Sequence, residues 1–170
     1  MRFVTIDPQP SLTAACIHTP PYNYKLVKVP FVPNCSHLKM NRNDKCRNWL
    51  NHHTYKIKNH LDIVSEYIPD DIDQIYIEGQ FKGRAMIGID YFMRGYFSLK
   101  YPNARVHTLS AKTWKTILDE GVQKGKSYYE EKMWEEIDTD NVFDLCPDEL
   151  GNRNHDLVDV YCMMKYLLKN

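Results

Sequence analysis

The residues best suited to chemistry are four carboxylates at the ends of predicted elements: Asp7, Glu78, Asp156 and Asp159. Asp7 ends a short β-branched run near the start of the chain, and Glu78 ends a second apolar run near its middle. A carboxylate at the end of a buried strand is costly unless it is paired or binds a metal ion. Carboxylate oxygens suit Mg²⁺, which keeps further positions open for water and phosphate. The four acids therefore predict a site for a pair of Mg²⁺ ions.

The last two acids lie on a predicted amphipathic helix near the end of the chain. Apolar side chains recur there at the i, i+3, i+4 and i+7 spacing, from Leu157 to Leu168. Asp156 and Asp159 then emerge on one face, where like charges repel unless a cation lies between them. An alternative stays open, because acids in a first helical turn also interact favourably with the helix dipole, with Asn154 as an ordinary N-cap.

Length and composition limit the class of protein. The chain has 170 residues, of which 43% are hydrophobic and 26% charged, as expected for a single globular domain over residues 1–170. We find no apolar stretch of membrane-spanning length and no charged-then-apolar leader. Five cysteines with irregular spacing favour reduced thiols. We therefore expect a soluble, intracellular protein with no membrane partner.

A formal net charge of zero hides two blocks of opposite charge. Lys39–Lys58 contains six basic residues and one acid, whereas Glu130–Glu149 contains nine acids and one base. Such a polarised molecule could hold phosphates on one face and keep the other in solvent. Within the basic block, the candidates for contacts with phosphates are Arg42, Lys45 and Arg47.

The pattern of apolar residues predicts the element order βββαβαβααα. The strands are expected at residues 2–7, 11–18 and 22–32, at Ile75–Glu78 and at Arg105–Leu109, and the helices over Asn43–Tyr67, Phe81–Leu99, Lys112–Asp119, Ser127–Ile137 and the segment that carries Asp156 and Asp159. Three meandering strands followed by alternating helices and strands predict an α/β fold, a five-stranded mixed sheet with helices on both faces. The third strand alternates apolar and polar residues, so one of its faces is expected in solvent.

The ordered motifs are Ile6-Asp7-Pro8 at the end of the first strand, Ile77-Glu78 at the end of the fourth, and Asp156-x-x-Asp159 on the last helix. Together they resemble the RuvC-type Holliday junction resolvases over nearly the whole chain. The resemblance implies a ribonuclease H-like fold, a homodimer and a catalytic tetrad of the four acids. Bacterial members usually have glycine where this chain has Gln9, and the acidic loop before the last helix also differs. The chain is more similar to the divergent viral and phage branch, which implies action in the host cytoplasm or nucleus where DNA replicates.

The resemblance also implies the chemistry. As a hypothesis, each subunit holds two Mg²⁺ ions, with Asp7 bridging them, Glu78 on one and the helical pair on the other; Mn²⁺ is expected to substitute. One ion would lower the pKa of an attacking water, and the other would stabilise the leaving 3′ oxygen. Twofold symmetry would give paired nicks with 5′-phosphate and 3′-hydroxyl ends. The expected partner is branched DNA, with no small-molecule substrate.

The same resemblance gives weaker candidates for contacts with DNA. Phe81 sits where the family has an aromatic residue that enters the junction, with core packing as the alternative. Lys115 and Lys126 fall near family lysines that approach the scissile phosphate, and we expect Lys115 to be catalytic; the alternative is a solvated lysine. Neighbouring bases are also expected to bind DNA, namely Lys82, Arg84 and Lys112. Independently of the resemblance, His155 adjoins the acids and could position water or phosphate, or simply cap the helix.

The Phe81–Leu99 helix matches the dimer helix of the family. Its glycines, Gly83, Gly88 and Gly95, would permit close approach of a partner helix. A monomer core that tolerates glycine is the alternative.

Two other functions stay open. The chain could be a different ribonuclease H-like nuclease that cuts RNA/DNA hybrids or other branched DNA. The DEDD exonucleases are disfavoured because they have two acids one residue apart in the first strand, and Asp7-Pro8-Gln9 lacks the second. The chain could also be a non-catalytic junction-binding protein, although such a protein is expected to have lost one of the four acids.

Overall fold

The structure is a computed structural model that describes residues 1–9, 12–30, 57–80, 84–118, 126–146 and 154–170. The first part of the helix predicted over Asn43–Tyr67 lies outside these ranges, and residues 57–65 of it are helical. The other helices are α2 (Arg84–Lys100), α3 (Ala111–Trp114), α4 (Lys126–Glu135) and α5 (Asn154–Lys169), with short 3₁₀ helices η2 (Lys115–Leu118) and η4 (Thr139–Asn141).

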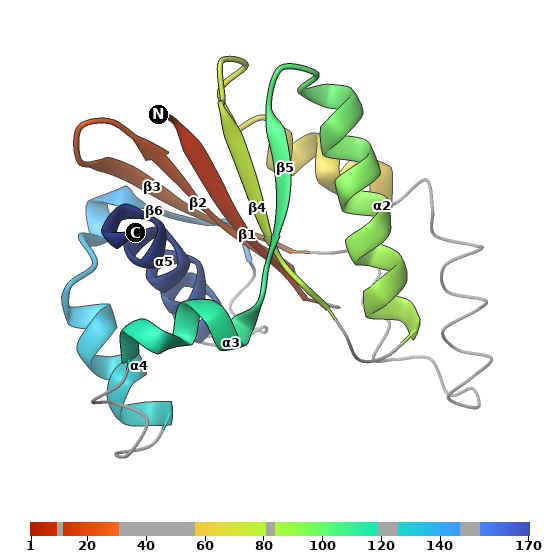
Figure 1. Ribbon diagram of the computed structural model, residues 1–170. Coiled ribbons are helices and arrows are strands. Elements are labelled where there is room, and N and C mark those ends of the chain that lie inside the picture. The colour runs from red at the N-terminus through yellow and green to blue at the C-terminus, as the bar shows by residue number, and fades with distance from the viewer. Residues whose placement is uncertain (10–11, 31–56, 81–83, 119–125, 147–153) are drawn as a thin grey trace.

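Six strands form one mixed sheet in the spatial order β5-β4-β1-β2-β3-β6 (Figure 1). They are β1 (Phe3–Pro8), β2 (Leu12–Thr19), β3 (Asn23–Pro30), β4 (Gln74–Glu78), β5 (Arg105–Leu109) and β6 (Val142–Asp144). Strands β1 to β3 are an antiparallel meander, β4 and β5 run parallel to β1, and β6 runs parallel to β3. The predicted α/β fold with a mixed sheet is confirmed. The predicted strand number was one too low, because three-residue β6 lies in a segment whose acidic composition indicated a loop.

Helices cover both faces of this sheet. Figure 1 shows α2 on one side of the strands and α5, with α3 and α4, on the other. Because side chains alternate along a strand, neighbouring residues of β1 enter opposite layers: Val4 and Ile6 face α2, whereas Phe3 faces α5. All six residues of β1 are buried, so its last residues lie between two covered faces.

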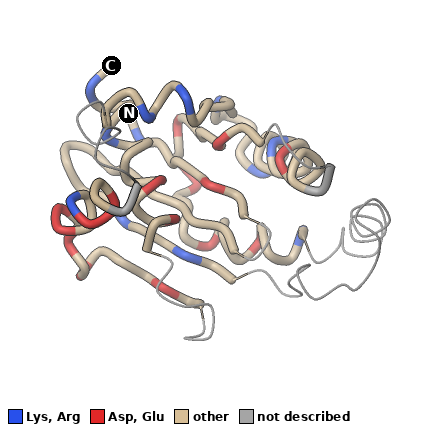
Figure 2. Tube along the Cα trace, turned by 90° about the horizontal axis from the view of Figure 1, so that it is seen from below, with Lys and Arg blue, Asp and Glu red and all other residues tan. Residues whose placement is uncertain are grey.

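Charged positions in the described ranges are distributed unevenly. Figure 2 shows acidic positions gathered on the side formed by α4, η4 and β6, while basic positions are scattered. This acidic side corresponds to the described part of the Glu130–Glu149 block. The basic block lies outside the described residues as far as residue 56, so the polarised charge distribution stays a prediction.

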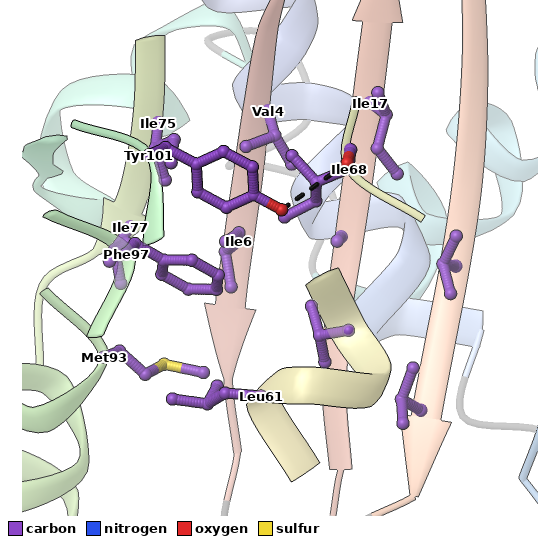
Figure 3. Close-up of a cluster of buried hydrophobic side chains, with 14 of the residues drawn as sticks. Val4, Ile6, Ile17, Leu61, Ile68, Ile75, Ile77, Met93, Phe97 and Tyr101 are labelled. Carbon is purple, nitrogen blue, oxygen red and sulfur yellow. Dashed lines mark hydrogen bonds between the residues drawn. The ribbon is translucent and has the colours of Figure 1, made fainter. Parts of the chain in front are cut away.

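The layer on the α2 side is a closely packed apolar core (Figure 3). Its members include Val4, Ile6, Ile17, Leu61, Ile68, Ile75, Ile77, Met93, Phe97 and Tyr101. The phenol of Tyr101 donates hydrogen bonds to the backbone carbonyls of Ser65 and Ile68, at 3.2 and 3.4 Å. A buried tyrosine needs such an acceptor, so these bonds fix the end of α2 against the preceding helix.

Strand β3 contradicts the expectation of a solvated face. Lys28 lies on the α5 side of this strand with only 1% of its side chain exposed. Its ammonium is 2.7 Å from Oδ2 of Asp144, on β6. The added strand therefore covers a position that the alternating pattern assigned to solvent, and it supplies the carboxylate that a buried ammonium needs.

The segment after β5 also differs from its prediction. One helix was expected over Lys112–Asp119, but the backbone changes from α3 to the 3₁₀ helix η2 at Lys115. Ser110 occupies the N-cap position as predicted, although its side chain makes no capping hydrogen bond; its backbone carbonyl accepts from the N–H groups of Thr113 and Trp114.

Among the described helices, none combines the length and the apolar character that a membrane span requires.

Candidate active site

Two neighbouring parallel strands bring the first two acids together. In the register of β1 and β4, Ile6 pairs with Ile77, so the next residues, Asp7 and Glu78, lie at the carboxyl ends of the two strands, on the same side of the sheet. Ile6 and Ile77 both pack in the α2-side core, so alternation turns both acids toward α5. The carboxyl ends of parallel strands are where ligands gather in open α/β sheets.

Helix α5 crosses these strand ends and supplies the other two acids. Thr5 of β1 donates a hydrogen bond of 2.8 Å to the backbone carbonyl of Val160, which anchors the helix to the strand that carries Asp7. The next residue toward the N-terminus of α5 is Asp159, and Asp156 lies one turn earlier. The helix buries both acids because its first three turns pack on the sheet, as the spacing of its apolar residues predicted.

All four carboxylates are buried: the exposed fraction is 0% for Asp7, 8% for Glu78, 1% for Asp156 and 8% for Asp159. Burial raises the pKa of Asp7 well above its ordinary value, and the charge and hydrogen bonding of Glu78 raise it further. The charge of Asp159 adds to this rise, whereas a hydrogen bond from Gln9 opposes it. Asp7, Glu78 and Asp159 therefore interact as one acidic cluster.

Each of the strand acids has a side-chain donor that the sequence did not predict. The amide nitrogen of Gln9 lies 3.0 Å from Oδ1 and 3.0 Å from Oδ2 of Asp7. The indole N–H of Trp114, on α3, donates to Oε1 of Glu78 at 3.0 Å. Trp114 is fully buried, and a buried indole N–H usually finds an acceptor, which is the one sequence signal that could have pointed to this contact.

The two acids on α5, Asp156 and Asp159, also have polar side chains beside their carboxylates. The phenol of Tyr129, on α4, donates to Oδ1 of Asp159 at 3.3 Å. Burial raises the pKa of Tyr129, and the charge of Asp159 raises it further, so this phenol stays a donor. Nε2 of His155 lies 3.2 Å from Oδ1 of Asp156. The contact agrees with the expectation that His155 adjoins the acids, while its role in positioning water or phosphate stays a prediction.

The donor set suits a hard divalent cation, because four buried carboxylates offer only oxygen ligands and carry negative charge that a cation would offset. Within the described ranges, however, no three His, Cys, Asp or Glu side chains already stand in an arrangement that could hold a metal ion. The fit to a divalent cation therefore rests on the type and the burial of the four side chains.

Lys115 lies beside the cluster, next in sequence to Trp114. It is half-buried, and its ammonium lies 4.9 Å from the centroid of the Trp114 ring. Burial raises the pKa of the Cys162 thiol on α5 to about 12, and the charge of Lys115 is among the influences that oppose this rise. Trp114 packs in the α5-side layer, so the ammonium of Lys115 lies next to the layer that holds the acids.

The remaining predicted DNA-binding residues are less well placed by the structure. Lys112 is exposed on α3, Arg84 is the first residue of α2, and Lys126 is the first residue of α4. The other candidates lie outside the described residues: Phe81, Lys82, Arg42, Lys45 and Arg47.

No protein-family model and no curated protein matches the sequence. The structure, in contrast, is similar to solved structures over nearly its whole length. Compared with the yeast mitochondrial Holliday junction resolvase Ydc2, the TM-score is 0.55 at 13% identity, covering 97% of this chain and 76% of Ydc2. Compared with RuvC of Thermus thermophilus in complex with a Holliday junction substrate, it is 0.50 at 10% identity, covering 99% and 96%. A further structure of Thermus thermophilus RuvC gives a TM-score of 0.51. The chain therefore has the RuvC-like, ribonuclease H-like fold that its sequence predicted.

Proposed function

We propose that this protein is a metal-dependent endonuclease that resolves four-way DNA junctions by paired, symmetric nicks. The observation that carries the proposal is the cluster of buried acids at the carboxyl ends of β1 and β4, completed by α5. The RuvC-like fold supports the same reading, because the acids lie on the elements that the family resemblance assigned to its tetrad. Four buried carboxylates are also far more than a structural core needs.

In this proposal, Asp7, Glu78, Asp156 and Asp159 are the metal ligands. Mg²⁺, or Mn²⁺ in its place, would supply the Lewis acidity that activates water and neutralises charge on the leaving oxygen, with two ions per subunit. The protein's own contribution is to hold the ligands. Trp114 orients Glu78 and Tyr129 orients Asp159, and such outer hydrogen bonds fix the direction of a ligand.

Lys115 is proposed to act on the substrate rather than on the metal. Its half-buried ammonium lies beside Trp114, which itself bonds Glu78. A cation held there would stabilise negative charge that develops on the phosphate in the transition state. We infer that the products are a 5′ phosphate and a 3′ hydroxyl.

A homodimer would place two such sites about a twofold axis, which matches the symmetry of a four-way junction. The outer face of α2 supports this part of the proposal. Tyr91 and Leu99 are 68% and 85% exposed on it, and Gly95 lies between them. A Cβ built on Gly95 meets nothing within 4 Å, so the surface is open to a second helix. Large exposed apolar side chains around a small residue favour close helix contact.

The test is cleavage of a synthetic four-way junction with Mg²⁺, using a matched linear duplex and an RNA/DNA hybrid as comparison substrates. We expect symmetric nicks in opposite strands of the junction and little cutting of the duplex. Preferred cutting of the hybrid would favour the other ribonuclease H-like nuclease. Tight junction binding without cleavage, in Mg²⁺ and in Mn²⁺, would favour a non-catalytic junction-binding protein.

A further inference from the structure

Gln9 makes a contact with the cluster that neither the fold nor the proposed tetrad accounts for. Its amide nitrogen is equally distant, at 3.0 Å, from both carboxylate oxygens of Asp7. Both oxygens of Asp7 therefore already have a donor. A cation bound by Asp7 would have to approach these same oxygens, so the amide and the cation compete for them.

The chemistry of the amide explains why its nitrogen faces the acid. The nitrogen carries two N–H donors, whereas the carbonyl oxygen of the same group is only an acceptor and would be repelled by a carboxylate. Asp7 is fully buried and interacts with the carboxylates of Glu78 and Asp159. The Gln9 amide therefore offsets part of the negative charge where a cation would otherwise be needed.

The backbone of Gln9 is held independently of its side chain. Its N–H donates to the carbonyl of Leu12 at 2.9 Å, which closes the connection between β1 and β2. The preceding residue, Pro8, is already paired with Thr13 of β2. The side chain itself is only half-buried, so its rotation about χ angles need not move the strand.

We propose that Gln9 competes with the metal for Asp7: its amide donates to the carboxylate, and a divalent cation that binds there displaces it. The proposal rests on the proposed function in one respect, since it takes Asp7 to be a metal ligand. Two consequences follow. The amide competes with the cation, so it weakens metal affinity, and it stabilises the metal-free fold.

The direct test measures binding of Mg²⁺ and Mn²⁺ by isothermal titration calorimetry, together with thermal unfolding with and without metal. Gln9→Met keeps the length of the side chain and removes both donors, and Gln9→Ala removes the whole group. Both variants should bind metal about tenfold more tightly, because a hydrogen bond to a charged group no longer has to be broken. Both should also unfold at a lower temperature without metal and regain the difference when saturated with it.

Gln74→Met is the matched control. The amide of Gln74 donates to the sulfur of Met1 at the other end of the sheet, so this variant should leave metal affinity unchanged. Weaker metal binding by Gln9→Met would overturn the inference and make Gln9 a ligand instead. Unchanged binding by both Gln9 variants would overturn it as well, while the proposed metal site would stand. If the wild-type protein bound neither ion, the inference and the metal site would both fall.

Discussion

At the scale of single residues, the acids and their hydrogen-bond donors have separable tasks. The carboxylates supply charge, and the donors supply direction, since Trp114 and Tyr129 each reach one acid from a different helix. A substitution that keeps the shape of an acid but removes its charge therefore tests ligation alone.

We predict that Asp7→Asn, Glu78→Gln, Asp156→Asn and Asp159→Asn each abolish cleavage of a four-way junction. The amides preserve size but cannot supply the negative charge that binds Mg²⁺. Junction binding should remain measurable by gel shift, because recognition of shape and phosphates does not depend on the tetrad. Near-normal turnover by any one variant would remove that residue from the site.

A second residue-scale prediction concerns His60, buried on the opposite face of the sheet. Nε2 of His60 lies 2.8 Å from the hydroxyl of Thr13, and burial lowers the pKa of His60 from 6.5 to about 4. The unfolded chain therefore binds a proton more readily than the folded chain between these values. The stability contributed by neutral His60 is complete above pH 6.5 and falls as the pH drops toward 4, by about 3 kcal/mol in all.

His60→Gln keeps a partner for Thr13 but does not titrate. Urea unfolding from pH 7 to pH 4 should therefore give a flatter free-energy profile for this variant than for the wild type. Parallel profiles over that range would show that His60 does not control acid stability.

At the scale of elements, β6 is attached to the sheet by an ion pair whose two side chains differ in exposure to solvent. The Lys28 side chain is 1% exposed, whereas that of Asp144 is 40% exposed. Beside it, the N–H of Leu145 donates to the carbonyl of Lys28, and that of Cys146 to the carboxylate of Asp144. Removing Asp144 thus leaves a buried ammonium without a countercharge, whereas removing Lys28 leaves an exposed carboxylate.

We predict that Asp144→Asn destabilises the fold by about 2 kcal/mol, because a buried ammonium loses its countercharge. Lys28→Met should cost under about 1 kcal/mol, because Met fills the same apolar path and the remaining carboxylate can be hydrated. Free energies of unfolding in urea measure both. Equal costs for the two variants would mean that Lys28 is hydrated in solution.

The sequence predicts some contacts of the candidate site but not others. Asp7, Glu78 and Asp159 could be predicted to meet because periodicity locates strand ends and helix faces, and parallel strand ends meet at one edge. The donors Trp114 and Tyr129 could not, because neither lies at the end of a predicted strand or on the helix that carries the acids. Their contacts depend on how α3 and α4 pack against the sheet. Strand β6 and the burial of Lys28 were missed together, since β6 supplies the carboxylate that pairs with the Lys28 ammonium.

At the scale of the whole molecule, we expect the basic residues to have two separate roles, one in cleavage and one in DNA binding. We predict that Lys115→Ala lowers the single-turnover cleavage rate about a hundredfold with only modestly weaker binding, because its charge acts mainly on the transition state. Lys112→Ala, three residues away and exposed, is the control and should affect binding alone. A normal rate for Lys115→Ala would assign that lysine to the solvated surface.

Removing Arg42, Lys45 and Arg47 together should weaken DNA binding and lower its salt dependence by about one unit of slope per lost phosphate contact.

Dimer formation is the other property of the whole molecule. Helix α2 contains one residue at which a substitution can test it, Leu99, and one at which it cannot, Ile89. Ile89 packs into the α2-side core, so a charge there would unfold the chain and could not report on a dimer. Leu99 is 85% exposed on the outer face of the same helix. If that face is a twofold interface, Leu99→Glu would bury two unpaired charges, each costing several kcal/mol.

We therefore predict that the wild-type protein is a dimer by light scattering at micromolar concentration and that Leu99→Glu is a folded monomer. The monomer should still bind metal but should nick junctions one strand at a time, since the two sites are no longer joined. Leu168→Glu, at a half-exposed leucine on α5, is the matched control and should remain a dimer. A Leu99→Glu protein that stays dimeric would place the interface elsewhere, and a monomeric wild type that still makes paired nicks would show that the symmetry of cleavage comes from the junction alone.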